Sequence, residues 1–86
     1  METNKIEVTN VYVQMTDGTQ DYALSVRAKH EDEVRVILSD TTPDENTDDY
    51  IPLGNKQGIK SADYPGKVWV KNHVPKKTTY VVVGLA

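Results

Sequence analysis

The chain contains no cysteine and only two histidines among its 86 residues. The missing cysteines exclude disulfide bonds and thiolate metal ligands, and two histidines without cysteine argue against a structural zinc site. A chain of this length buries only about 60–65% of the surface that it exposes when unfolded, so its core is small. Small domains that lack such supports often depend on a partner subunit, and we therefore expect an oligomer or a lattice-bound protein.

Motifs of catalysis and of membrane insertion are also missing. The sequence has no glycine-rich phosphate loop, no nucleophile elbow and no HExxH. His30 stands in a run of charged residues and His73 stands shortly before Pro75, which is typical of solvated turns. No apolar run approaches membrane-spanning length, and the first residues contain no apolar signal segment. We therefore predict a non-enzymatic protein that needs no cofactor, is not exported and has no membrane partner.

Residues 64–72, YPGKVWVKN, hold the one tryptophan of the chain and have the pattern of a β-strand. Val68 and Val70 alternate with lysines and with Trp69, which is the period of a half-buried strand. Pro65 and Gly66 supply a turn before it. We predict that this strand is central and that the other strands are arranged around it.

Residues 6–15 form another expected strand, but their apolar positions change phase along it. Ile6 and Val8 stand at even positions, whereas Val11, Val13 and Met15 stand at odd positions. A one-residue β-bulge near residues 9–10 would restore a common face. Asp17-Gly18 is a signal for a two-residue hairpin turn after this strand. The hairpin would pair Val13 with Tyr22, Val11 with Leu24, Val8 with Val26 and Ile6 with Ala28.

Alternating or valine-rich segments predict the remaining strands, at residues 22–29, 33–39 and 78–85. Residues 55–61 suit an edge strand because they contain Gly58 and two lysines. Residues 1–5 are expected to form a flexible N-terminal arm. The fold class predicted for residues 1–86 is all-β: a single small antiparallel β-sandwich or barrel, Ig-like or jelly-roll-like, with about six or seven strands.

Residues 40–50 are the longest polar segment and contain five carboxylates without a base. Clustered carboxylates can bind calcium. However, their spacing does not match an EF-hand loop, and the glycine that such a loop needs is missing. We therefore favour a solvated acidic loop over a cation site and assign no metal ligand.

Charge is distributed unevenly along the chain. Residues 1–50 carry twelve acidic and four basic side chains, whereas residues 51–86 carry one acidic side chain and six lysines. A sandwich that interleaves the two halves would cancel this asymmetry in space. The alternative is a polar molecule whose acidic end meets the basic end of a neighbour. Nucleic acid is a weaker choice of partner, because the formal net charge is −3.

A surface for a protein partner can be predicted from the residues that face away from the expected core. Ile37 lies on the outward parity of its strand, which indicates a second covered surface. A lone tryptophan in a strand of a small domain lies more often in the core or at an interface than on a sugar-stacking platform. We predict a partner surface made of Trp69, Lys67, Lys71, Lys76, Lys77 and Ile37. The lysines would set orientation at its rim, and Ile37, Val81 or Val83 would lie at its apolar centre. Val82 is instead expected on an inner face.

The order of these segments resembles a known class of proteins. A valine-rich N-terminal hairpin is followed by VILSDTTP (residues 36–43), YIPLG (50–54), PGKVWVKN (65–72) and TTYVVV (78–83). In layout this resembles small β-sandwich virion proteins of tailed bacteriophages, such as capsid decoration, head-fibre and neck or tail accessory proteins. Val70 and Lys71 stand where similar chains have small residues, and no functional residue is carried over.

The resemblance implies a structural virion protein that is made in the host cytoplasm and binds the head shell in many copies. Its partners would be other virion proteins, either the major capsid protein or neck and tail proteins, and copies of itself. The alternative from a different class is a carbohydrate- or receptor-binding module of a tail or fibre.

Overall fold

A computed structural model describes residues 2–27, 33–72 and 79–85, and in these ranges the chain forms eight β-strands and no helix. The strands are β1 (Glu2–Val8), β2 (Val13–Gln14), β3 (Tyr22–Arg27), β4 (Glu33–Leu38), β5 (Ile51–Gly54), β6 (Gly58–Lys60), β7 (Val68–Asn72) and β8 (Thr79–Leu85). The all-β prediction is confirmed. The count exceeds the predicted six or seven because the segment expected as one strand over residues 6–15 is divided between β1 and β2, and because Ile51–Gly54 forms β5.

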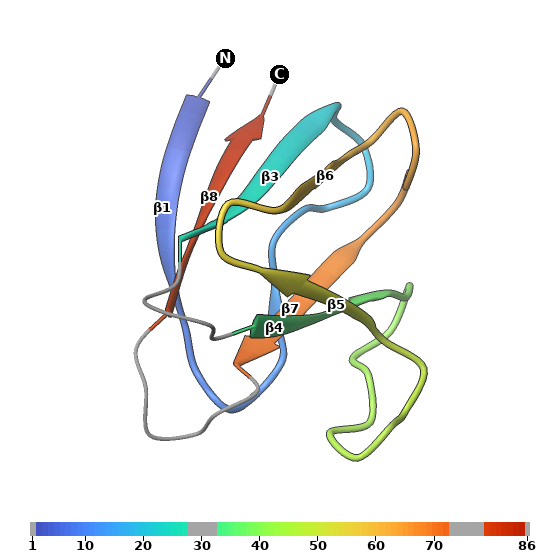
Figure 1. The fold of residues 1–86 in the computed structure, drawn as a ribbon. Helices are drawn as coiled ribbons and strands as arrows, with labels where there is room; N and C mark the ends of the chain where they lie inside the picture. Colours follow the sequence, from blue (N-terminus) through green and yellow to red (C-terminus); the bar gives the residue numbers. More distant parts are fainter. Residues whose placement is uncertain (1, 28–32, 73–78, 86) are drawn as a thin grey trace.

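The strands form two four-stranded sheets that pack face to face (Figure 1). Sheet A has the order β1-β8-β3-β6, and sheet B has the order β2-β7-β4-β5. Antiparallel pairs join β1 with β8, β2 with β7, β3 with β6 and β4 with β5. These pairs nest inside one another along the chain, as in a long hairpin that has been rolled up, which is the jelly-roll arrangement. Of the two predicted sandwich types, the structure therefore has the jelly-roll type.

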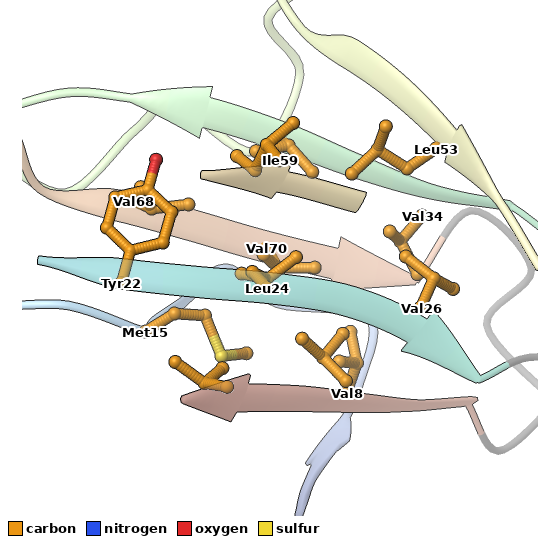
Figure 2. Packing of buried hydrophobic residues seen from close by; sticks show 13 residues of the cluster. Val8, Met15, Tyr22, Leu24, Val26, Val34, Leu53, Ile59, Val68 and Val70 are labelled. Atoms are coloured by element: carbon orange, nitrogen blue, oxygen red, sulfur yellow. The ribbon is translucent and has the colours of Figure 1, made fainter. Parts of the chain in front are cut away.

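The space between the sheets is filled mainly by valine. The buried cluster contains Val8, Met15, Tyr22, Leu24, Val26, Val34, Val36, Leu53, Ile59, Val68, Val70, Val81 and Val83 (Figure 2). β-Branched side chains suit this environment because they pack well on a pleated surface. Within β7, Val68 and Val70 are fully buried and β7 lies inside sheet B, as the sequence predicts. The predicted inward face of β3 is also confirmed up to Val26, and Ala28 lies outside the described residues.

The prediction of a flexible arm over residues 1–5 is wrong for the residues that the structure describes. β1 begins at Glu2, and all seven of its residues pair with β8, from Glu2 opposite Leu85 to Val8 opposite Thr79. The side chains of residues 2–5 are all polar. Edge strands are joined through backbone groups, so they tolerate exposed polar side chains.

The predicted N-terminal hairpin is also wrong. The turn at Asp17-Gly18 exists, and Gly18 has a φ of +85° that suits glycine. The side-chain oxygen of Asp17 accepts hydrogen bonds from the backbone and the hydroxyl of Thr19, and these bonds lower the pKa of Asp17 below its usual value. However, the turn leads from sheet B into sheet A, so β2 pairs with β7 and β3 pairs with β8 and β6.

The change of phase within residues 6–15 therefore has another cause than a bulge. After β1 the chain leaves sheet A and runs along the edge of β7. The amide of Asn72 donates to the carbonyl of Thr9 at 2.8 Å, and the amide of Met15 donates to the carbonyl of Val68 at 2.7 Å. Val8 and Met15, which have opposite parities, both point into the core because the segment crosses from one sheet to the other. Val11, which the predicted hairpin would place inward opposite Leu24, is 50% exposed.

The prediction of an edge strand within residues 55–61 is confirmed. β6 is the outer strand of sheet A and pairs with β3 alone. A Cβ atom on Gly58 would overlap the backbone carbonyl of Leu24, so this close approach of two strands requires glycine.

Candidate functional site

The outward side of sheet B brings together three of the predicted partner residues. In β7, Trp69 and Lys71 alternate with the buried valines and therefore point away from the core. The register between β4 and β7 places Ile37 opposite Trp69 and Arg35 opposite Lys71. These four residues share one surface, which is called the outer face of sheet B below.

The acidic loop, residues 40–50, packs onto this face. The indole Nε1 of Trp69 donates a hydrogen bond of 2.8 Å to the carbonyl of Ser39, the residue just before the loop. Ile37 is only 9% exposed, and it lines a shallow depression together with Pro43 and Thr47 of the loop. The second covered surface predicted from the parity of Ile37 therefore exists, and residues of the same chain cover it.

Glu45 is the central contact between the loop and sheet B. Its backbone carbonyl accepts a hydrogen bond of 2.9 Å from the ammonium group of Lys71, and its Oε2 lies 3.4 Å from the same nitrogen. Its Oε1 accepts a bond of 3.2 Å from the backbone N–H of Tyr12. The side chain of Lys71 is 13% exposed, so this lysine is enclosed by its own chain.

Aromatic rings and cations surround this contact. The guanidinium of Arg35 lies 4.4 Å from the centroid of the Tyr50 ring, and the ammonium of Lys71 lies 5.4 Å from that of Tyr12. Burial raises the pKa of the Tyr12 hydroxyl, and the nearby Arg35 partly opposes this rise. The Tyr12 hydroxyl and Arg35 Nε have no hydrogen-bond partner among the described residues.

Two of these contacts were missed by the sequence-based reasoning, which assigned no role to Glu45 or Arg35. The acidic loop has no base of its own. Lys71 of β7 forms an ion pair with its Glu45, and Arg35 of β4 contacts the loop through the ring of Tyr50. A signal was present in the sequence. Arg35 and Lys71 both stand on outward parities of predicted strands, so both were available to a loop rich in carboxylates.

The other predicted lysines are placed apart from this contact or not described. Lys67 is half-buried and lines a second shallow depression with Leu38, Asp40 and Pro65. Lys76 and Lys77 lie outside the described residues.

No metal cluster is assembled in the part of the chain that the structure describes. There, no three carboxylate or histidine side chains gather closely enough to hold a metal ion. In the acidic loop, Asp44 accepts a hydrogen bond from the backbone of Asn46 at 2.9 Å, which is a local turn contact. In the same ranges, no helix has the length and apolar character needed to cross a membrane.

The outer face of sheet A carries small side chains in its middle, whereas toward β1 the ammonium of Lys5 lies 4.2 Å from the centroid of the Tyr80 ring. The outward positions in its middle are Ala23, Ser25, Val82 and Gly84, which are exposed or half-buried. The parity predicted for β8 is therefore wrong: Val81 and Val83 are buried in the core, and Val82 points outward. The acidic loop contacts the opposite sheet through Trp69 and Lys71 and so does not cover this middle.

Comparisons with known proteins return no match: no family model, no curated protein and no solved structure is similar to this chain. The class of the protein is therefore defined by its strand order, which is that of a small jelly-roll β-sandwich.

Proposed function

We propose that the chain is a structural protein of a tailed bacteriophage particle and that it binds the head shell in many copies. The observation that carries the proposal is the jelly-roll order of the strands, an architecture found in viral capsid proteins and in lectins. This step is an analogy of architecture, because one fold supports many functions. The layout of the segments in the sequence supports the same proposal.

The contacts on sheet B change where the partner surface is placed in this proposal. Ile37 and Lys71 are occupied by the chain's own acidic loop. We therefore place the apolar centre of the shell contact on the outer face of sheet A, around Val82. Small side chains in the middle of this face suit docking on a broad shell, since close packing needs few side chains to rearrange. Lys76 and Lys77 are kept as proposed charged contacts with the shell, and both lie outside the described residues.

Co-sedimentation with empty shells is the direct test. The shells are assembled from the major capsid protein encoded in the same genome, and a genome that encodes none would overturn the proposal. We expect the chain to sediment with the shells and to associate more slowly at about 1 M salt, where the Debye length is near 3 Å. The apolar contact itself should persist at that salt concentration.

Two variants with the same change of chemistry locate the contact. Val82→Glu places a carboxylate on the outer face of sheet A and should reduce the bound fraction about tenfold or more. Val11→Glu is the control, because Val11 is 50% exposed in the segment between β1 and β2. It should bind as the wild-type chain does. Thermal melting of both variants shows whether each is folded.

Failure to bind at any salt concentration would end the shell-binding proposal. Trp69 fluorescence would then test the carbohydrate-binding alternative, with bacterial polysaccharide as the probe. Because the Nε1 of Trp69 is already bonded to Ser39, we expect no change in emission when the polysaccharide is added.

A further inference from the structure

Among the described strands, β1 differs from the other strands at the edges of the two sheets. In sheet B, β2 has two residues, and β5 contains Pro52, which has no N–H to donate. In sheet A, β6 has three residues. Short strands and proline are the usual protections of a sheet edge. β1 has seven residues without proline, and β8 occupies one side of it along its whole length.

The side chains of β1 alternate in a self-complementary way. Lys5 and Glu7 are exposed and point to the outer side of sheet A, where the ammonium of Lys5 lies 4.2 Å from the centroid of the Tyr80 ring. Ile6, between them, points toward the core and is half-buried. A lysine alone at an edge repels a second strand. A lysine and a glutamate two residues apart instead attract a second, antiparallel copy of the same strand in one particular register.

We propose that β1 pairs with β1 of a second copy of this chain, antiparallel and about a two-fold axis at Ile6. In this register, Lys5 of each copy lies opposite Glu7 of the other, so two attractive pairs form on one face. Registers centred on Lys5 or on Glu7 would place like charges opposite each other. Charge therefore selects the register centred on Ile6.

The proposed pairing of the two β1 strands is limited to five residues of each copy and has two-fold symmetry. Residues 4–8 of each copy take part, with Asn4 opposite Val8 and Ile6 opposite Ile6. The two A sheets join into one continuous sheet, and the Ile6 side chains meet on its core side. A two-fold contact uses the same surface on both copies and therefore stops at a dimer. The inference does not rest on the proposed function, because it uses the geometry of the edge alone.

Cysteine cross-linking tests the register. Residues opposite each other in an antiparallel pair have Cα atoms about 4.5–5.5 Å apart, which is within the range of a disulfide bond. The chain has no cysteine, so a thiol introduced by Ile6→Cys is the only one present. We expect this variant to form a disulfide-linked dimer on mild oxidation.

Asn4→Cys is the matched control. In the proposed register the two Asn4 positions are four residues apart along the strands, or about 14 Å, which a disulfide cannot span. Cross-linking of this variant as readily as of Ile6→Cys would overturn the register.

Reversal of the charges gives a second test, which leaves the half-buried Ile6 unchanged. Lys5→Glu alone and Glu7→Lys alone each replace two attractive pairs by two repulsive pairs, so each should raise the dimer dissociation constant about tenfold or more. The double variant Lys5→Glu/Glu7→Lys restores opposite charges and should dimerise like the wild type. Sedimentation equilibrium measures the constants, and far-UV circular dichroism confirms that each variant is folded.

Three results would overturn the pairing. One is a wild-type chain that stays monomeric throughout the micromolar range. Another is a pair of single charge variants that dimerise as tightly as the wild type. The third is a monomer whose β1 amides are protected from hydrogen exchange only when empty shells are added, which would assign the edge to a strand of the shell protein. Loss of shell binding with an intact dimer would contradict the proposed function alone.

Discussion

At the scale of single residues, Glu45 makes the contact with the largest consequence for the surface of the molecule. Its ion pair with Lys71 contributes little by itself, because the side chain of Glu45 is 42% exposed. The hydrogen bond from the Tyr12 amide to Glu45 Oε1 contributes more to stability than the ion pair. Tyr12 is only 6% exposed, and loss of Glu45 would remove the acceptor of its N–H. Leaving such a group unpaired costs about 1–3 kcal/mol.

We expect Glu45→Ala to lower the free energy of unfolding by about 1–2 kcal/mol and to loosen the acidic loop. Hydrogen exchange at the Tyr12 amide and proteolysis within residues 40–50 should both become faster. Asp48→Ala is the control, because Asp48 is an exposed carboxylate of the same loop. Unchanged exchange at Tyr12 would show that Glu45 does not hold the loop on sheet B.

At the scale of strands, β4 is covered on both of its faces. On the core side, Val34 and Val36 are fully buried, and β4 lies between β5 and β7 in sheet B. On the other side, the acidic loop covers Ile37. A strand with neighbours on both edges and cover on both faces tolerates a polar side chain least, because a carboxylate there has no access to water.

Val36→Asp should therefore prevent stable folding. Burial of an unpaired carboxylate costs several kcal/mol, which is comparable to the whole stability of a small domain, about 5–15 kcal/mol. We expect the variant to lose the β-type far-UV spectrum and its cooperative melting transition. Val11→Asp, at a half-exposed position, should melt as the wild type does. Normal melting of Val36→Asp would mean that β4 faces the other way.

At the scale of the whole molecule, the fold joins segments that are far apart in the sequence. Glu2 lies opposite Leu85, Val13 lies opposite Val70, and Ala23 lies opposite Lys60. Each of these pairs closes a long loop of chain before its contacts can form. Proteins dominated by such pairings fold slowly, because the entropic cost of closing each loop precedes the contacts that stabilise it.

Refolding from urea should therefore take milliseconds to seconds, as in other β-sandwiches of this size. Trp69 fluorescence in a stopped-flow instrument measures it, because Trp69 is half-buried by contacts that form only in the folded state. Measurements at two protein concentrations separate folding from dimer formation. A refolding time in microseconds would contradict the long-range pairing described above.

The sequence by itself determined the kind of element and the side on which most residues lie. Alternation placed Val68 and Val70 toward the core and Trp69 away from it, and it placed Ile37 on an outward surface that is covered. These inferences succeed because they are local. A strand exposes alternate residues on opposite faces whatever it pairs with.

Only the tertiary structure decided which strands are neighbours and what covers the outer face of sheet B. Backbone N–H and C=O groups are alike in every strand, so alternation cannot choose between a hairpin at Asp17-Gly18 and a crossing between sheets. The rolled-up pairing buries both parities of residues 6–15 in one core and gives residues 2–5 a partner in β8. It also brings Lys71 to Glu45, 26 residues away, so that a lysine predicted for a partner is held by its own chain.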